Sequence, residues 1–107
     1  MKVRTINFVA EYTDTPGGRY KAQGDHSGEL FRESILKPAI QEYDSVVLDL
    51  NGVFSLPPSF IDEAIGILVD QLGEKAVGAK LVVKIDDNPI AKRRIADVIR
   101  DHSSKKS

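Results

Sequence analysis

One hydroxyl and two acids follow a proline pair where an apolar segment gives way to a helical pattern. They are Ser59, Asp62 and Glu63, just after Pro57-Pro58. In open α/β sheets, ligands and partners contact the protein beyond the carboxyl ends of strands, where loops lead into helix N-termini. Ser59 can cap this helix, with Asp62 at the N3 position of a variant capping box, or it can accept a phosphate. A phosphate would be attracted by the helix N–H groups and repelled by the two acids.

A larger charged set allows a different chemistry, with Arg side chains that bind phosphate and carboxylates that bind a divalent ion or act in acid–base steps. Its members are Arg19, Arg32, Asp49, Asp62 and Glu63. Simpler interpretations exist for each of them. Asp62 and Glu63 suit the first turn of a helix or pair with an arginine, and Asp49 can accept N–H groups of the Asn51-Gly52 turn. Arg19 fits an exposed hairpin. No spacing here is diagnostic of a metal site, so we expect no metal and no cofactor.

The sequence gives little support to nucleophilic catalysis or nucleotide binding. It has no Cys, two His, no Gly-Lys-Ser/Thr phosphate loop and no Gly-x-Ser-x-Gly motif. His26 stands between Asp25 and Ser27, but adjacent residues do not converge on one point as a triad does. His102 falls at the predicted frayed C-terminal end, where the flexible tail begins. We therefore expect a protein that is not an enzyme.

Length and charge favour one small domain that does not bind nucleic acid generally. The 107 residues fit a single domain, predicted as 1–102 with a flexible tail at 103–107. The 15 Lys and Arg residues against 16 Asp and Glu residues give a formal net charge of -1, whereas nucleic-acid binders are usually basic. A basic C-terminal stretch, with Lys92, Arg93 and Arg94 at its start, keeps nucleic-acid binding as a third alternative.

The absence of Cys and of long apolar runs predicts where the protein resides. The N-terminus lacks the apolar segment of a signal peptide, and no apolar run reaches the roughly 20 residues of a membrane span. An absence of Cys fits a reducing compartment. We expect a cytoplasmic protein that does not enter a membrane, and the sequence leaves its oligomeric state open.

Hydrophobic periodicity predicts an α/β fold with the element order β-β-α-β-α-β-α. Apolar alternation and the Pro16-Gly17-Gly18 turn predict an N-terminal β-hairpin, with strands at about 3–12 and 19–23. Helical spacing predicts a helix at 28–42, which Pro38 kinks or splits, a helix from Ser59 to Gly73 and a helix from Pro89. Strands are predicted at 46–50 and 81–85. Gly73 and Gly78 are placed at the end of the second helix and in its exit loop. The result is a four-stranded mixed sheet with an antiparallel N-terminal hairpin and about three helices. The continuous apolar run at 46–50 predicts a central strand buried on both faces.

The segment from Val47 to Val53, followed by an apolar bridge, a Ser and an amphipathic helix, resembles the STAS domain of anti-sigma-factor antagonists and sulfate-transporter tails. A closer resemblance is to small bacterial proteins called STAS-like. It is carried by the combination of Gly17-Gly18-Arg19, Gly24, Ser27-Gly28-Glu29, Phe31-Arg32, Asp49-Leu-Asn-Gly52 and Ser59-Phe60-Ile-Asp62-Glu63. It covers most of the chain from Pro16 to Val69.

The resemblance implies a regulatory module that binds a GHKL-type ATPase or kinase and is released when phosphorylated. STAS antagonists carry Asp-Ser/Thr-Ser-Gly at this corner, which places Pro58 at the usual phosphoacceptor and Ser59 at the following Ser. Proline cannot accept phosphate, so Ser59 is the candidate acceptor. Phe54 and Phe60 flank the corner, and we expect one to be core and the other an exposed anchor. The predicted partner-binding residues are Arg19, Phe54, Pro58, Ser59, Phe60, Asp62 and Glu63.

Overall fold

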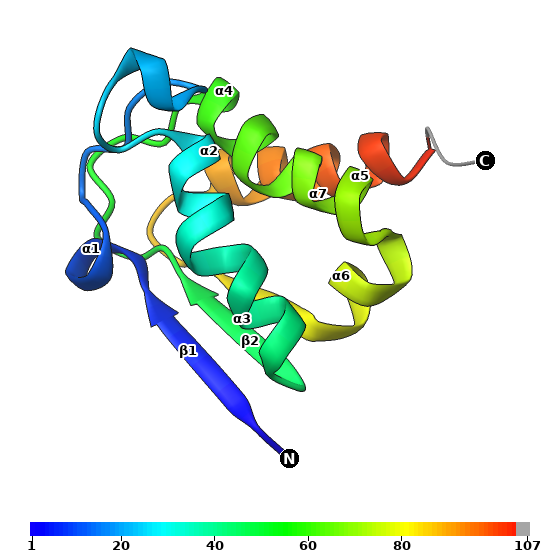
Figure 1. Cartoon of the computed structure of the whole chain (residues 1–107). Coiled ribbons are helices and arrows are strands. Elements are labelled where there is room, and N and C mark those ends of the chain that lie inside the picture. Colours follow the sequence, from blue (N-terminus) through cyan, green and yellow to red (C-terminus); the bar gives the residue numbers. More distant parts are fainter. Residues whose placement is uncertain (105–107) are drawn as a thin grey trace.

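Three parallel strands form the sheet in the computed structural model, which describes residues 1–104. They are β1 (Val3–Asn7), β2 (Ser45–Asp49) and β3 (Leu81–Lys84), in the order β1-β2-β3 (Figure 1). In the register, Ile6 lies opposite Leu48, which lies opposite Val83 on its other side. The prediction of a central strand near residues 46–50 is confirmed.

Two long helical segments return the chain between the strands, and each contains a wider π-helical turn. Helix 28–42 comprises α2 (Gly28–Phe31), the π turn η2 (Arg32–Leu36) and α3 (Lys37–Glu42), and helix 58–72 comprises α4 (Pro58–Ile61), the π turn η3 (Asp62–Gly66) and α5 (Ile67–Leu72). The shorter elements are α1 (Phe8–Glu11) and the 3-10 turn η1 (Lys21–Gln23); α6 (Glu74–Lys80) and α7 (Pro89–Ser104) complete the fold.

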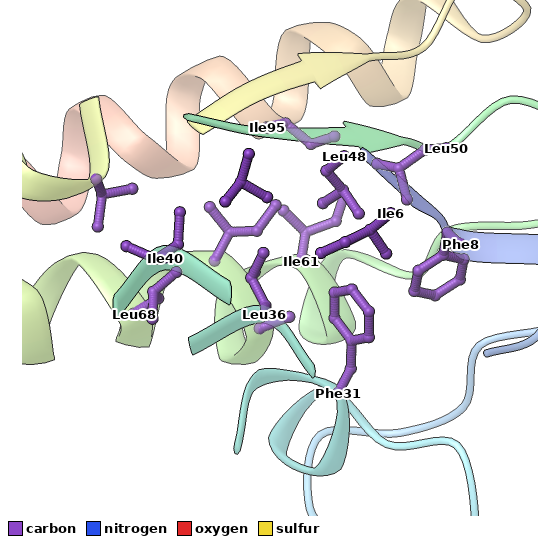
Figure 2. Close-up of a cluster of buried hydrophobic side chains, with 14 of the residues drawn as sticks. Ile6, Phe8, Phe31, Leu36, Ile40, Leu48, Leu50, Ile61, Leu68 and Ile95 are labelled. Carbon is purple, nitrogen blue, oxygen red and sulfur yellow. The ribbon is translucent and has the colours of Figure 1, made fainter. Parts of the chain in front are cut away.

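The helices cover one face of the sheet, and the core lies between the two. Figure 2 shows side chains from the strands, such as Ile6 and Leu48, directed toward Leu36, Ile61 and Leu68 of the two long helices. All five side chains are at most 1% exposed. Helix 58–72 contacts both helix 28–42 and α7. The core therefore fixes the long helices against each other as well as against the sheet.

The other face of the sheet is open. Thr5, Val47 and Val82 lie side by side across the strands on that face, and Val82 is 53% exposed. Only alternate residues of β2 are buried, among them Val46 and Leu48. The prediction that the central strand is buried on both faces is wrong, because helices pack on a single face.

The predicted N-terminal hairpin does not form, so the four-stranded mixed sheet is wrong. β1 ends at Asn7, whose side chain accepts a hydrogen bond from Ala10 N (3.1 Å) and caps α1. The Glu11 carboxylate in turn accepts the Asn7 N–H (2.8 Å). These local bonds turn the chain into a helix and place Phe8 in the core, fully buried. The residues predicted as the second strand contain η1 instead.

Helix 28–42 continues through Pro38 without being split into two separate helices. Its π turn lies immediately before the proline, with Lys37 N donating to Arg32 O, five residues back. Helix 58–72 has a matching turn, in which Ile67 N donates to Asp62 O. No proline lies inside that second helix beyond its first residue, so a π turn at this level of the fold does not depend on a proline.

The C-terminal third contains more helix than predicted. Gly73, with φ 93°, ends helix 58–72 as expected, but the predicted exit loop is α6, and Gly78 lies inside it. The prediction of about three helices is therefore too low. α7 begins at Pro89 as predicted, with Asn88 Oδ1 accepting Ala91 N (3.0 Å), and continues to Ser104. Residues 105–107 of the predicted tail lie outside the described residues. None of the described helices is long and apolar enough to cross a membrane.

Candidate functional site

A buried ion pair joins the π turns of the two long helices. Arg32 Nη1 lies 2.7 Å from Glu63 Oε2 and also donates to the Glu63 carbonyl (2.5 Å). Arg32 and Glu63 are 5% and 6% exposed, and the Arg32 Nε donates to Glu33 (2.9 Å). Burial lowers the pKa of Arg32, but its bonds to Glu63 and Glu33 prevail and raise the pKa overall. The buried Arg32 guanidinium is therefore held by carboxylate partners from both long helices.

Arg19 extends this arrangement to the N-terminal part of the chain. Its Nη1 lies 2.6 Å from Asp62 Oδ2 and 3.7 Å from Glu63 Oε1. The loop that carries Arg19 covers the N-terminus of α2, because Gly18 O accepts Gly28 N and Arg19 O accepts Glu29 N, both at 3.0 Å. The predicted exposed hairpin Arg is wrong, whereas the alternative pairing of Arg19 and Arg32 with the two acids is confirmed.

His102 completes the arrangement, although the sequence analysis placed it at a frayed C-terminal end. It is 4% exposed, with Nε2 2.7 Å from Asp62 Oδ1 and Nδ1 3.0 Å from Asp70 Oδ2. The sequence contained a signal for this position. Ala91, Ile95, Val98 and His102 are spaced by four, three and four residues, which places His102 on the same face of a helix as the apolar residues. We call Arg19, Arg32, Asp62, Glu63, Asp70 and His102 the ion-pair cluster.

The cluster lowers the pKa of Asp62. Burial raises the pKa of this carboxyl, but hydrogen bonds from His102 and Arg19 prevail and lower the pKa overall. Asp62 thus carries a negative charge held between a cation from the N-terminal loop and a ring from the last helix. Its two oxygens are engaged by residues 43 and 40 positions away in the chain.

Two glycines allow the helices to approach closely at the cluster. A Cβ at Gly66 would lie 2.4 Å from His102 Nε2, so only glycine leaves room for the imidazole against helix 58–72. A Cβ at Gly28 would lie 2.8 Å from Phe60 O. Both distances are shorter than real Cβ contacts, so the close packing of α7 and α2 on helix 58–72 depends on these residues.

The corner after β2 differs from the ion-pair cluster, because it carries an exposed aromatic side chain on a loop held by hydrogen bonds. Phe54 is 84% exposed, and its N–H donates to Asp14 O (2.8 Å). The preceding turn is held to the loop after β3, since Gly52 N donates to Asp87 Oδ2 (2.9 Å). Asp49 Oδ1 accepts Asn51 N (3.0 Å), as its structural interpretation predicted. Hydrogen bonds therefore fix the backbone that carries Phe54.

Ser59 is placed differently from the prediction. The N-cap of α4 is Pro57, without a side-chain capping bond, and Ser59 is the second residue of the helix. Phe60 N and Ile61 N both donate to Pro57 O, at 3.1 and 3.2 Å. The capping role of Ser59 and the N3 position of Asp62 are therefore wrong, because the proline pair starts the helix two residues earlier. Ser59 is half-buried, and its role as phosphoacceptor stays a prediction.

The two aromatics at the corner divide as expected. Phe60 is 3% exposed and packs edge-on against Phe8, with ring centroids 5.6 Å apart, whereas Phe54 faces solvent. Phe60 is thus core and is withdrawn from the predicted partner surface. Glu63, Asp62 and Arg19 are engaged in the ion-pair cluster. Of the predicted partner-binding residues, Phe54, Pro58 and Ser59 remain at the corner with exposed or half-exposed side chains, and we call these three the corner surface.

The alternative ligand site comes together only in part. Four of its five residues belong to the ion-pair cluster, whereas Asp49 bonds to the turn after β2. Within residues 1–104, no group of three or more His, Asp or Glu side chains is arranged to hold a metal ion. An apolar cavity of about 10 Å³, lined by Phe31, Phe60 and neighbouring residues, lies beneath the corner and has the size of about one water molecule.

The basic stretch of the last helix faces solvent. Lys92, Arg93 and Arg94 are exposed on the first turns of α7, while Ile95 is buried beneath them. This is the arrangement of a solvated helix face, which was the simpler interpretation of their charge.

Fold and site together define an α/β domain in which helices cover one face of a parallel sheet and a strand-to-helix corner carries an exposed aromatic. A model of the family described as a STAS-like domain of unknown function matches residues 27–91, and the chain belongs to this family. The matched segment runs from the residue before α2 to the first turn of α7. It contains Arg32, Asp62, Glu63 and Asp70, whereas Arg19 and His102 lie on either side of it. No curated protein and no solved structure matches the chain.

Proposed function

We propose that this protein is a non-catalytic STAS-like module that binds another protein, a GHKL-type ATPase or kinase, through the corner surface. The observation that carries the proposal is the 84% exposure of Phe54 on a loop whose backbone is held by hydrogen bonds. The loop follows the central strand and leads into the helix, which is where open α/β sheets meet their partners. The family match supports a STAS-like module, and the regulatory role rests on the resemblance to anti-sigma-factor antagonists.

The order of the loop makes Phe54 suitable as an anchor. An aromatic side chain contributes strongly to binding when it enters a pocket on the partner, and it has few rotatable bonds to immobilise. Here the backbone is already fixed by the bonds of Phe54 N to Asp14 O and of Gly52 N to Asp87. Binding therefore requires little further ordering of the loop.

The acids near the corner have a supporting role in this proposal. Asp62 and Glu63 bind Arg19, Arg32 and His102 and so fix the start of helix 58–72 relative to its neighbours. Their engagement also weakens the alternative, an enzyme or phosphate-binding protein, because both arginines already have carboxylate partners. The structure of the cluster thus favours a rigid support beneath an interaction surface.

Binding can be tested by titrating the full chain with a purified GHKL-type ATPase, chosen from genes adjacent to the one for this protein. Phe54→Ala should weaken binding by about tenfold or more, the range of an interface hot spot. Val82→Ala is the matched control, since Val82 is 53% exposed on the open face of the sheet. Equal binding by both variants and the parent would contradict the corner as the site. Micromolar binding of nucleotide or inorganic phosphate by the isolated protein would favour the alternative.

Phosphorylation of Ser59 is the regulatory part of the proposal. A phosphate there would meet acids that are already paired with Arg19, Arg32 and His102, so their repulsion is reduced. Pro58 has no N–H, and Phe60 N and Ile61 N donate to Pro57 O, so few helix donors are left to hold the phosphate. We therefore expect the modified side chain to project toward the partner and oppose binding.

The acceptor is identified by incubating the protein with the kinase and ATP. Ser59→Ala should abolish the label, and Ser55→Ala, an exposed serine of the same corner, should leave it unchanged. Label that persists in Ser59→Ala would rule this residue out as the acceptor without affecting the test of Phe54.

A further inference from the structure

The hydrogen bonds that His102 can make depend on its protonation state. Nε2 lies 2.7 Å from Asp62 Oδ1, and Nδ1 lies 3.0 Å from Asp70 Oδ2. A neutral imidazole has one N–H, so it can donate to one carboxylate only and presents a lone pair to the other. An imidazolium donates to both. The two bonds of this buried ring are therefore satisfied together only when His102 is charged.

The ring is enclosed by charged groups from several elements. Asp62 and Asp70 come from helix 58–72, and Asp62 is also bonded by Arg19 from the N-terminal loop. On α7 itself, the exposed Arg100 is bound to Asp97 and Asp101 and not to the ring's carboxylates. Two carboxylates, Asp62 and Asp70, therefore bond the ring, and Arg19 competes for one of them by bonding Asp62.

His102 also marks where the last helix is fastened. α7 buries Ala91 and Ile95 in its first half, whereas Val98 and Ile99 in its second half are only partly buried. The imidazole lies against Gly66, where a Cβ would come within 2.4 Å of Nε2. Apolar packing thus anchors the start of α7, and the contacts of His102 secure its end.

We propose that His102 is a protonation-dependent latch, which holds the end of α7 on helix 58–72 when the ring is charged and releases it when the proton is lost. The release is local, because Ala91 and Ile95 keep the first half of α7 in the core and the sheet does not depend on His102. Residues 98–104 are the part that opens.

The direction of the pH dependence follows from the environment of the ring. Burial lowers the pKa of His102, but the bonds to Asp62 and Asp70 prevail and raise the pKa above the ordinary value of 6.5. A group whose pKa is raised by folding stabilises the folded state fully below its unfolded pKa. That contribution is lost as the pH rises through the folded pKa, so the latch opens on the alkaline side.

The test combines a histidine NMR titration with hydrogen exchange on the full chain. The chain has only two histidines, so a His26→Asn variant assigns the signals. We expect His102 to titrate above about 6.5, the ordinary value for histidine. After correction for intrinsic exchange, residues 98–104 should exchange on the order of tenfold faster once His102 is deprotonated, while β2 stays protected. His102→Gln should remove this pH dependence.

Variants of the acids separate the latch from a general effect of charge. Asp70→Asn removes one carboxylate from the ring and should lower the His102 titration midpoint. Asp97→Asn is the matched control, because Asp97 pairs with Arg100 (3.1 Å) on the exposed side of α7. The proposal is overturned by a midpoint at or below 6.5, by protection of 98–104 that does not change across the titration, or by equal shifts in the two Asn variants.

Discussion

The ion-pair cluster and the corner surface differ in whether their side chains have partners inside the chain. In the cluster, Arg32 and Glu63 are 5% and 6% exposed and bond to each other, as do the buried His102 and its two acids. At the corner, Phe54 is 84% exposed on a loop whose backbone is fixed. Groups with partners inside the chain stabilise the fold, whereas a large apolar side chain held in solvent is available to another molecule.

The charged residues nearest the corner have partners inside the chain. Asp62 and Glu63 follow Ser59 closely in sequence, but their side chains are engaged by Arg19, Arg32 and His102. Withdrawing one charge of a buried pair leaves its partner uncompensated, which costs free energy. The two regions should therefore respond differently to substitution, the cluster in stability and the corner in binding.

The largest effect on stability is expected at the buried pair. Glu63→Gln removes the buried carboxylate that pairs with Arg32, and the free energy of unfolding should fall by about 3 to 5 kcal/mol in denaturant titrations. Glu33→Gln is the control, because Glu33 bonds to the same arginine with a 36% exposed side chain and should cost less than about 1 kcal/mol. Similar losses in the two variants would refute a special role for the buried pair.

Gly66→Ala should have the next largest effect. The new Cβ would displace the imidazole from its position 2.4 Å away, at a cost of about 1 to 3 kcal/mol. Gly78→Ala is the matched substitution, since a Cβ there meets nothing within 4 Å and the residue lies inside α6. It should stabilise the protein by roughly 0.5 to 1 kcal/mol. Thermal unfolding of both variants measures the difference, and a stable Gly66→Ala would argue against tight packing of His102.

Tyr12 should have an effect between those of the cluster and of the corner. Its partly buried hydroxyl donates to Ser27 O (2.7 Å). Tyr12→Phe should cost about 1 kcal/mol, the typical contribution of one hydrogen bond. Burial raises the pKa of Tyr12 to about 12, despite a backbone hydrogen bond that lowers it. Because folding raises this pKa, the contribution of the protonated Tyr12 hydroxyl to the free energy of unfolding is fully present below the unfolded pKa of about 10. That contribution is lost as the pH rises toward 12.

An absorbance titration of the phenolates tests this assignment. Tyr12 should ionise late, and the late step should be missing in Tyr12→Phe. A late step that persists in the variant would assign it to another residue.

The smallest effect on stability is expected at the corner. Phe54→Ala removes an 84% exposed side chain and should change the free energy of unfolding by less than about 0.5 kcal/mol. The same variant should lose partner binding, so the two measurements together distinguish an interaction residue from a structural one. A large loss of stability would show that Phe54 supports the fold instead.

Local sequence signals predicted the elements that depend on local chemistry. The central strand, the helix over 28–42, the end of the next helix at Gly73 and the start of α7 at Pro89 are as expected. The hairpin failed because Asn7 and Glu11 form a cap that the apolar alternation did not reveal. The family resemblance, carried by short motifs, is confirmed.

The site was predictable in its residue types but not in its pairings. Arg19, Arg32, Asp62 and Glu63 were all candidates, and a pairing between the acids and the arginines was one alternative. His102 was missed because its spacing on the apolar face of α7 was not extended past Ile99. Ser59 was misplaced by two helical positions because a proline pair, and not a serine, begins the helix.

The sequence by itself determined the order of most elements and the family, since these depend on neighbouring residues and short motifs. Only the tertiary structure decided which charges meet. Asp62 bonds residues 43 and 40 positions away because the N-terminal loop and the last helix pack against the same turn. Periodicity specifies which face of a helix is buried, but the residue that lies across that face is set by how the helices pack. Here the packing decides which groups are paired inside the fold and which stay exposed.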